Sequence, residues 1–98
     1  MKESQIEARL VRAVKQRGGL CFKWVSPGNN GVPDRIVITP QGRVIFVELK
    51  TDTGRLSQIQ VLQQGLLRSR KAEVVTLYGM QDVEAFVAAV FQEEVRPK

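Results

Sequence analysis

The sequence predicts an α/β fold in which three helices and four strands follow one another in the order α-β-β-β-α-β-α around a central mixed sheet. Three observations support this fold class. Apolar residues recur at helical spacing in three segments, short runs rich in β-branched residues lie between those segments, and turns rich in glycine and proline separate several of the runs. A tight turn joins antiparallel strands, whereas an intervening helix favours parallel pairing, so we expect both kinds of pairing in the sheet.

The chain is short enough to form only one domain. Its 98 residues, of which 43% are hydrophobic and 26% are charged, have the composition of a globular protein. A second core would bury too little apolar surface to offset the entropy of ordering it. We therefore expect a single domain over residues 1–98, with a frayed tail at residues 93–98.

The composition also limits the chemistry. With no histidine and one cysteine, Cys21, the usual zinc sites and the serine or cysteine triads that need a histidine base are excluded. Any metal would be a hard ion bound by oxygen atoms. The chain shows no secretory leader and no apolar run that could cross a bilayer, so we expect a cytoplasmic protein with no membrane partner and no small-molecule cofactor. The net charge of +5 favours a polyanionic partner.

The first helix is expected to begin at residues 4–7, whose sequence SQIE has the form of a capping box. Apolar residues then recur at helical spacing until the glycine pair at 18–19 ends the helix. Glu7 has two interpretations. As the last residue of the box its side chain reaches back to the Ser4 N–H, or it lies close enough to the buried stripe to point into a functional site. The apolar stripe consists of Ile6, Leu10 and Val14.

Three strands are expected after this helix. Residues 20–25 combine β-branched and aromatic side chains, which suit a pleated surface, and they lead into a loop over residues 26–31. Residues 34–39 and 43–50 form the next two strands. The turn between them, residues 40–42, contains a glycine that suits a left-handed position in a three-residue hairpin.

This short turn fixes the pairing of the two hairpin strands. If Thr39 lies opposite Arg43, the numbers of paired residues sum to 82, and Asp34 then lies opposite Glu48. Both strands are apolar on both faces, which is typical of central strands covered on two sides. The two acids are thus placed at the rim of a buried sheet, where their burial is costly without a partner.

The remaining chain adds a helix, a strand and a third helix. After a loop over residues 51–55, residues 57–60 form a second capping box and open a helix that ends near Arg70. Residues 73–77 form a short strand that is expected to pair in parallel with the preceding strand. Asp82 caps the last helix. The expected apolar faces are Ile59, Leu62 and Leu66 in the second helix, and Val83, Phe86, Val87, Val90 and Phe91 in the third.

Asp34, Glu48 and Lys50 form a candidate catalytic group. Carboxylates opposite each other in an antiparallel pair have Cβ atoms about 4.5–5.5 Å apart and repel, whereas a divalent cation between them reverses that effect. Lys50 projects to the same side as Glu48 because the two lie two residues apart on one strand. A cation such as Mg²⁺ polarises a phosphodiester, and Lys50 would orient or help deprotonate the attacking water. The alternative is a surface salt-bridge cluster, which would contribute little stability.

These residues resemble a known nuclease signature. The dipeptide PD at residues 33–34, followed by ELK at residues 48–50, is similar to the PD-(D/E)xK signature of restriction-endonuclease-like nucleases. The order α-β-β-β-α-β agrees with the fold of that superfamily. The resemblance therefore implies a PD-(D/E)xK restriction-endonuclease-like fold.

A closer resemblance is to the VRR-NUC family, the viral-type replication and repair nucleases. The pattern of that family resembles a glutamate in the first helix, here Glu7, then GVPD at residues 31–34, the ExK of the third strand, and LSQIQ at residues 56–60. The likeness extends from about residue 3 to residue 78, which is most of the chain. The elements in this order are more specific than PD-(D/E)xK alone.

The resemblance implies a metal-dependent endonuclease that acts on DNA, often on branched or junction structures in replication, repair or recombination, with Mg²⁺ or Mn²⁺. By position, Asp34 and Glu48 would hold the metal together with the carbonyl of Leu49, and Lys50 would be the catalytic lysine. Glu7 would lie near the metal, through a water molecule.

Two further implications concern the second helix and the assembly. Gln60 would help to position Lys50 or the substrate, although the capping box at residues 57–60 also explains its presence. Resemblance to the stand-alone viral members implies a homodimer, and a phage-encoded protein would act in the cytoplasm of its bacterial host.

Contacts with DNA outside the catalytic group have a second interpretation, because an exposed cation is often only a solvated charge. The glycines beside the loop asparagines permit a close approach to a phosphate, and Trp24 either stacks on a base or packs in the core. The candidate contact residues are Lys23, Arg35, Arg68, Asn29 and Asn30. Further cations are Arg9, Arg12 and Lys15 in the first helix and Arg70 and Lys71 after the second.

Two other functions fit the same residues. A non-catalytic module that binds structured DNA would keep the acids for structure or for a stabilising ion. A phosphodiesterase directed at RNA would use the same two carboxylates, because the metal, the water and the lysine do not contact the sugar.

Overall fold

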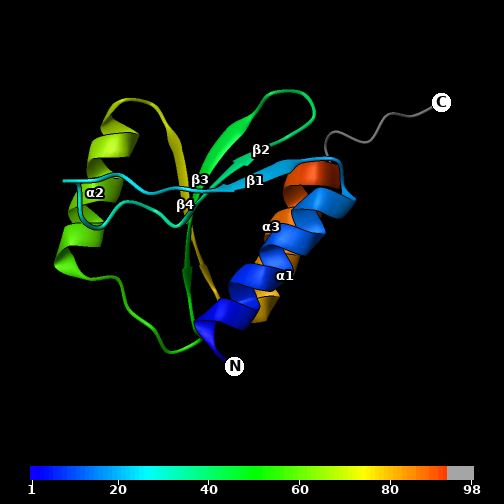
Figure 1. The fold of residues 1–98 in the computed structure, drawn as a ribbon, viewed down its shortest axis with the longest axis horizontal. Helices are drawn as coiled ribbons and strands as arrows, with labels where there is room; N and C mark the ends of the chain where they lie inside the picture. Colours follow the sequence, from blue (N-terminus) through cyan, green and yellow to red (C-terminus); the bar gives the residue numbers. More distant parts are fainter. Residues whose placement is uncertain (93–98) are drawn as a thin grey trace.

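The computed structural model describes residues 1–92 and has the predicted element order α-β-β-β-α-β-α; the predicted frayed tail, 93–98, lies outside the described residues. One mixed sheet has the strand order β1-β2-β3-β4. Helices α1 and α3 lie side by side over one face of the sheet, and α2 lies on the other side (Figure 1). The elements are α1 (Glu3–Gln16), β1 (Leu20–Lys23), β2 (Arg35–Ile38), β3 (Val44–Lys50), α2 (Gln58–Ser69), β4 (Glu73–Tyr78) and α3 (Gly79–Gln92).

Helix α1 begins earlier than predicted. Lys2 precedes the helix in an extended conformation, and its backbone N–H donates to Gln5 Oε1 at 2.9 Å. The predicted capping box at Ser4 is therefore wrong, because Ser4 already lies inside the helix and Gln5 makes the reciprocal contact. Glu3 occupies the first turn, where a negative charge is stabilised by the helix dipole. Glu7 lies a turn further on, beyond the cap.

The core lies between the sheet and the pair of helices α1 and α3. Alternate residues of β2, β3 and β4 point to this face, and the predicted apolar stripes of the first and third helices pack against them, as expected. The buried apolar residues form one cluster: Ile6, Leu10, Ala13, Val14, Val37, Ile45, Val47, Leu49, Leu77, Val83, Phe86, Val87, Val90 and Phe91.

The strand pairing agrees with the register derived from the turn. In the antiparallel pair of β2 and β3, Ile36 lies opposite Phe46, so the numbers of paired residues sum to 82 as predicted. Strands β3 and β4 pair in parallel, which places Glu48 beside Thr76. Asp34 directly precedes β2, and its carbonyl accepts a hydrogen bond from the backbone N–H of Trp24 in the continuation of the β1 ladder, at 2.9 Å. The register of β2 and β3 places Asp34, one residue before β2, level with Glu48.

Helix α2 packs on the sheet with the opposite face from the predicted one. The expected apolar face is turned outward: Ile59, Leu62 and Leu66 are 42%, 56% and 50% exposed. Its inward face is polar, and Gln64, which is 2% exposed, donates from Nε2 to Thr76 Oγ1 at 2.9 Å. The physical reason is that the sheet presents polar groups where α2 covers it, and buried polar groups require hydrogen-bonding partners.

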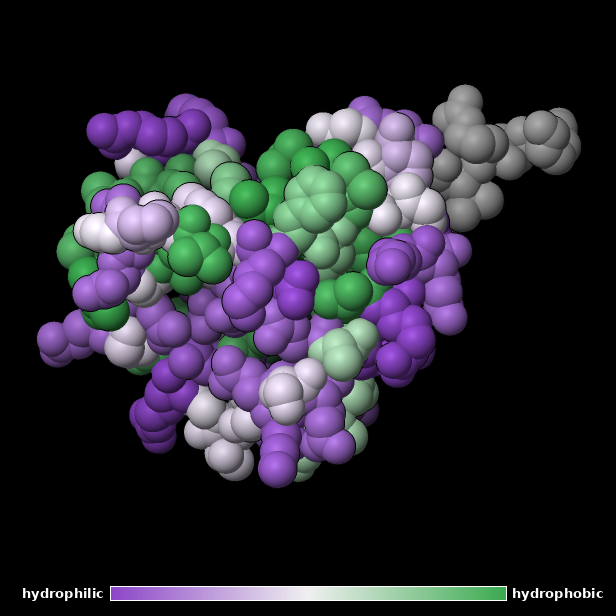
Figure 2. Space-filling model, viewed as in Figure 1, coloured by the Kyte–Doolittle hydropathy of each residue, from purple (hydrophilic) through white to green (hydrophobic). Residues whose placement is uncertain are grey.

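The sheet face that α2 covers is partly open, so the prediction that the hairpin strands are covered on both sides is wrong in part. Phe22 and Val44 point to this face and are 54% and 42% exposed. Figure 2 shows apolar surface over β1 and at the side where α2 lies. Trp24 is half-buried and packs against Phe46, with ring centroids 5.0 Å apart, outside the core cluster in which it was expected. No helix within residues 1–92 is long and apolar enough to span a membrane.

Candidate active site

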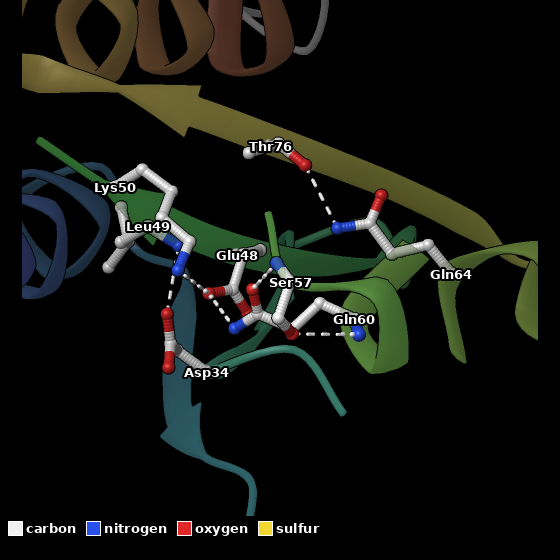
Figure 3. A network of polar contacts seen from close by, with 8 residues as sticks. All are labelled: Asp34, Glu48, Leu49, Lys50, Ser57, Gln60, Gln64 and Thr76. Atoms are coloured by element: carbon white, nitrogen blue, oxygen red, sulfur yellow. Dashed lines mark hydrogen bonds and ion pairs between the residues drawn. The ribbon is translucent and has the colours of Figure 1, made fainter. Parts of the chain in front are cut away.

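The candidate catalytic residues meet where β2 begins and β3 ends (Figure 3). Asp34 follows Pro33, which is buried, and a glycine at position 31 with a positive φ of 86°. A side chain at Gly31 would approach the backbone carbon of Ile59 to 3.0 Å, so the loop lies directly against the start of α2. The turn before β2 thus fixes Asp34 between the sheet and α2.

Glu48 is the most buried ionisable group of the site, with a side chain only 2% exposed. Its Oε2 accepts a hydrogen bond from Gln60 Nε2 at 3.0 Å and lies 3.7 Å from Lys50 Nζ. Its Oε1 is buried and has no hydrogen-bond partner among the residues that the structure describes. Buried carboxylate oxygens are normally paired, so Oε1 is an acceptor available to a further ligand.

The pKa of Glu48 reflects this environment. Burial, followed by the charge of Asp34, raises the pKa of Glu48 to about 7, and the ammonium of Lys50 opposes that rise. The charge of Glu3 raises it further. The raised pKa thus reflects burial first and repulsion from Asp34 second, and a divalent cation beside Glu48 would favour its charged form.

Asp34 is held by the backbone of the opposite strand. The N–H of Leu49 donates to Asp34 Oδ2 at 2.8 Å, so the carboxylate is fixed beside the strand that carries Glu48 and Lys50. Lys50 is largely buried, with a side chain 16% exposed, and points to the same side as Glu48 (Figure 3). The structure thus brings Asp34, Glu48 and Lys50 together.

The structure shows the predicted capping role of Gln60 and a contact with Glu48, rather than with Lys50. Gln60 Oε1 accepts from the Ser57 N–H at 2.9 Å, and Ser57 Oγ accepts from the Gln60 N–H at 3.2 Å, which is the predicted capping box. Its Nε2 donates to Glu48 as well. A side-chain amide can do both because it carries an acceptor and a donor group. Gln60 therefore links the first turn of α2 to the buried carboxylate.

Glu7 lies in a different environment from the other candidate residues. Arg35 donates from Nε to Glu7 Oε2 at 2.7 Å, and Lys23 Nζ lies 3.9 Å from the same oxygen. Glu3, rather than Glu7, is an acid of α1 that raises the pKa of Glu48. The sequence interpretation missed Glu3 because it placed the start of the helix at Ser4. The sequence signal for Glu3 is an acidic residue in the first turn of the helix.

The candidate DNA contacts are dispersed. Arg68 turns toward β4, where Nη2 donates to Gln64 Oε1 at 3.2 Å and to the Val74 carbonyl at 3.1 Å. Asn29 Nδ2 donates to Ser26 Oγ within its loop at 3.0 Å. The carbonyl of Asn30 accepts from Gln63 Nε2 at 3.0 Å, which ties the loop to α2. Arg35 and Lys23 lie beside Glu7.

The residues of the site suit a hard divalent cation. Within residues 1–92, no three or more Asp, Glu, His or Cys side chains gather into a metal-binding group. The candidate donors are instead the carboxylates of Asp34 and Glu48 and the backbone carbonyl of Leu49. Few protein ligands and several water molecules are the usual coordination of Mg²⁺. The unpartnered Glu48 Oε1 is the observation that supports this fit.

Comparison with known proteins agrees with this geometry. No family model matches the chain. A protein named "Putative nuclease p44", from Acyrthosiphon pisum secondary endosymbiont phage 1, is 38% identical over 90 residues, which are 92% of this chain and 96% of the relative. A solved structure described as "VRR_NUC domain" superposes with a TM-score of 0.84 at 26% identity and covers 90% of this chain and 96% of its own. The chain therefore belongs to the VRR-NUC family of nucleases.

Proposed function

We propose that this nuclease is a metal-dependent endonuclease, that its substrate is DNA with a branched or junction structure, and that residues 1–98 act as one domain. The observation that carries the proposal is the buried carboxylate of Glu48, whose Oε1 lacks a partner among the described residues. Asp34 and Lys50 lie beside it. The phage origin of the 38% identical relative supports a site of action in the cytoplasm of a bacterial host.

Each residue of the site has a role in the proposed reaction. Mg²⁺ or Mn²⁺, held by Asp34, Glu48 and the carbonyl of Leu49, would supply positive charge to the phosphodiester and to the pentacovalent transition state. Lys50 would orient the attacking water and stabilise the negative charge that develops on the phosphoryl oxygens. Gln60 would hold Glu48 through its 3.0 Å hydrogen bond. Glu3, and Glu7 through a water molecule, are candidates for the outer part of the metal site.

The test is cleavage of a labelled panel with Mg²⁺, Mn²⁺ or EDTA. The panel contains single-stranded, duplex, flap, splayed-arm and four-way-junction DNA, together with RNA of matched sequence. We expect metal-dependent cutting that favours the branched DNA and falls at least about a thousandfold in Lys50→Ala, because the lysine acts in the transition state. Arg70→Gln, an exposed cation at the far end of α2, is the control and should cut normally.

Other results would favour the alternative functions. Binding to junctions without cleavage in either metal would support a non-catalytic module. Preferred cleavage of RNA would support an RNA-directed phosphodiesterase. Cleavage retained in Lys50→Ala would remove the proposed role of the lysine.

We further propose that the protein is a homodimer that uses the outward face of α2. This face exposes Ile59, Leu62 and Leu66 to solvent. Gly65 lies in the same helix, and a side chain added there would have no atom within 4 Å. Glycine within a helix costs about 1 kcal/mol relative to alanine, so its presence supports a close approach by a second molecule rather than an internal packing role. Apolar side chains beside an unobstructed glycine would pack against the same face of a second copy.

Sedimentation equilibrium tests the homodimer. We expect the wild-type chain to have twice the monomer mass and Leu62→Lys to have the monomer mass, because a charge on the apolar face opposes its burial. Ala88→Lys places the same charge at an exposed position of α3 and should leave the dimer intact. A wild-type monomer, or equal effects of the two substitutions, would contradict this interface.

A further inference from the structure

A groove of about 630 Å³ runs beside α1, and the reaction described above makes no use of it. It is open to solvent, and its lining includes the small apolar residues Ala8 and Val11. The rest of its lining is polar or charged, namely Arg12, Lys15, Gln16 and Arg35.

The groove is strongly positive. Arg12, Lys15 and Arg35 line it and no acid does. Arg12 and Lys15 are exposed, and within residues 1–92 neither forms an ion pair. Arg35 is paired with Glu7, whose carboxylate is shared between Arg35, at 2.7 Å, and Lys23, at 3.9 Å. Cations without acidic partners in a concave surface concentrate the field there and attract a polyanion.

Arg35 is held ready for such a ligand. Its Nε donates to Glu7, its Nη1 donates to the Cys21 carbonyl at 3.3 Å, and its side chain is 18% exposed. A guanidinium that is already oriented loses less conformational entropy when it binds a phosphate. Arg12 and Lys15 lie three residues apart on α1 and therefore project from the same side of the helix.

The groove and the catalytic carboxylates are joined at one point of the chain. Arg35 follows Asp34 directly, and consecutive side chains of an extended segment point to opposite faces. Asp34 thus faces α2 and the reacting phosphodiester, while Arg35 faces α1 and the groove. A nucleic-acid strand that passes around this end of the sheet would contact both.

We propose that the α1 groove binds a backbone phosphate of the nucleic acid, beyond the phosphodiester that is cleaved. This inference rests on the proposed function. Its small apolar side chains suit a sugar, and its cations suit phosphate oxygens. Its lining is suited to hold the strand through the backbone, so the contact is independent of base sequence.

The test compares two double variants that remove the same charge. Arg12→Gln with Lys15→Gln removes two cations of the groove, and Arg70→Gln with Lys71→Gln removes two cations at the end of α2. All proteins carry Lys50→Ala, so binding of labelled branched DNA is measured by fluorescence anisotropy with Mg²⁺ over a range of salt concentrations. Thermal unfolding of each variant verifies that the fold is retained.

We expect the groove variant to bind roughly ten- to a hundredfold more weakly at 0.1 M salt, and its slope of log affinity against log salt to be shallower by about 2. The control variant should keep both values near those of its parent. Equal changes in the two variants would show a general effect of net charge, and no change in the groove variant would show that no phosphate lies there. Either result would overturn the proposal.

The cleavage panel keeps this inference separate from the proposed function. If the protein binds DNA with the expected salt dependence but does not cut it, the proposal for the groove stands and the proposed nuclease mechanism fails. If cleavage depends on Lys50 but the groove variant binds DNA normally, the nuclease mechanism stands and the proposal for the groove fails.

Discussion

Helices α1 and α2 look alike in sequence but pack in opposite ways. In each, a glutamine side chain accepts from the backbone N–H of the residue before the helix, and each has apolar residues at helical spacing. Helix α1 buries that apolar stripe in the core, whereas α2 exposes it and buries Gln64 instead. The difference lies in the sheet, which is apolar under α1 but presents Glu48 and Thr76 to α2. The two faces differ in role, because the α1 face contains the core and the α2 face holds the proposed catalytic groups.

The largest expected effect on this comparison comes from truncating one leucine in each helix. Leu10 is completely buried in α1, so Leu10→Ala should lower the free energy of unfolding by about 2–5 kcal/mol. Leu62 is 56% exposed in α2, so Leu62→Ala should cost the monomer less than about 1 kcal/mol. Urea unfolding at a concentration where the chain is monomeric measures both. Similar losses would mean that α2 also buries its apolar face in the monomer.

A second prediction concerns the negative charge of Glu48 on the sheet face that α2 covers. Because the pKa of Glu48 is raised from 4.5 to about 7, the protonated form is favoured in the folded protein. The stability contributed by that proton is fully present below pH 4.5 and is lost as the pH rises through 7. In EDTA at pH 8, Glu48→Gln should therefore be more stable than the wild type by up to about 3 kcal/mol, and the difference should vanish near pH 4.

Divalent metal and a second glutamate provide the controls for this prediction. Mg²⁺ should stabilise the wild type at pH 8 but not Glu48→Gln, because the ion binds the charged form. Arg43 lowers the pKa of Glu73, so Glu73→Gln should behave in the opposite sense and destabilise the protein above pH 4.5. Thermal unfolding at several pH values measures all three proteins. A pH-independent difference for Glu48→Gln would contradict the raised pKa.

The smallest expected effect separates the two contacts of Gln60. Ser57→Ala and Gln60→Ala each remove the capping box and should cost about 1 kcal/mol of stability. Only Gln60→Ala also removes the donor to Glu48, so cleavage should fall roughly ten- to a hundredfold in that variant alone. Steady-state cleavage with saturating metal, measured beside thermal unfolding, distinguishes the two. Equal activity in the two variants would limit Gln60 to its capping role.

The predictable features were those set by nearby residues. The turn at residues 40–42 determined the register of β2 and β3, and the residues Ser57 and Gln60 were sufficient to place the start of α2. The inward face of α2 could not be predicted from its own sequence. It depends on Glu48 and Thr76, which lie on two other elements.

The start of α1 and the position of Glu3 were missed for a related reason. Lys2 is not a typical cap residue, and the SQIE sequence offered a more familiar alternative one turn later. The effect of Glu3 depends on the fold, because its charge raises the pKa of Glu48 on a different element. Asp34, Glu48 and Lys50 could be grouped in advance because strand geometry alone brings them together.

The double contact of Gln60 has a consequence for local unfolding. The same amide side chain caps α2 and holds Glu48, so the first turn of the helix cannot fray without releasing the carboxylate. Opening of this turn and loss of the amide donor to Glu48 are thus one event, with one opening free energy. The amide of Val61, which donates to the Ser57 carbonyl at 3.0 Å, would report that event directly by its rate of exchange with solvent deuterium.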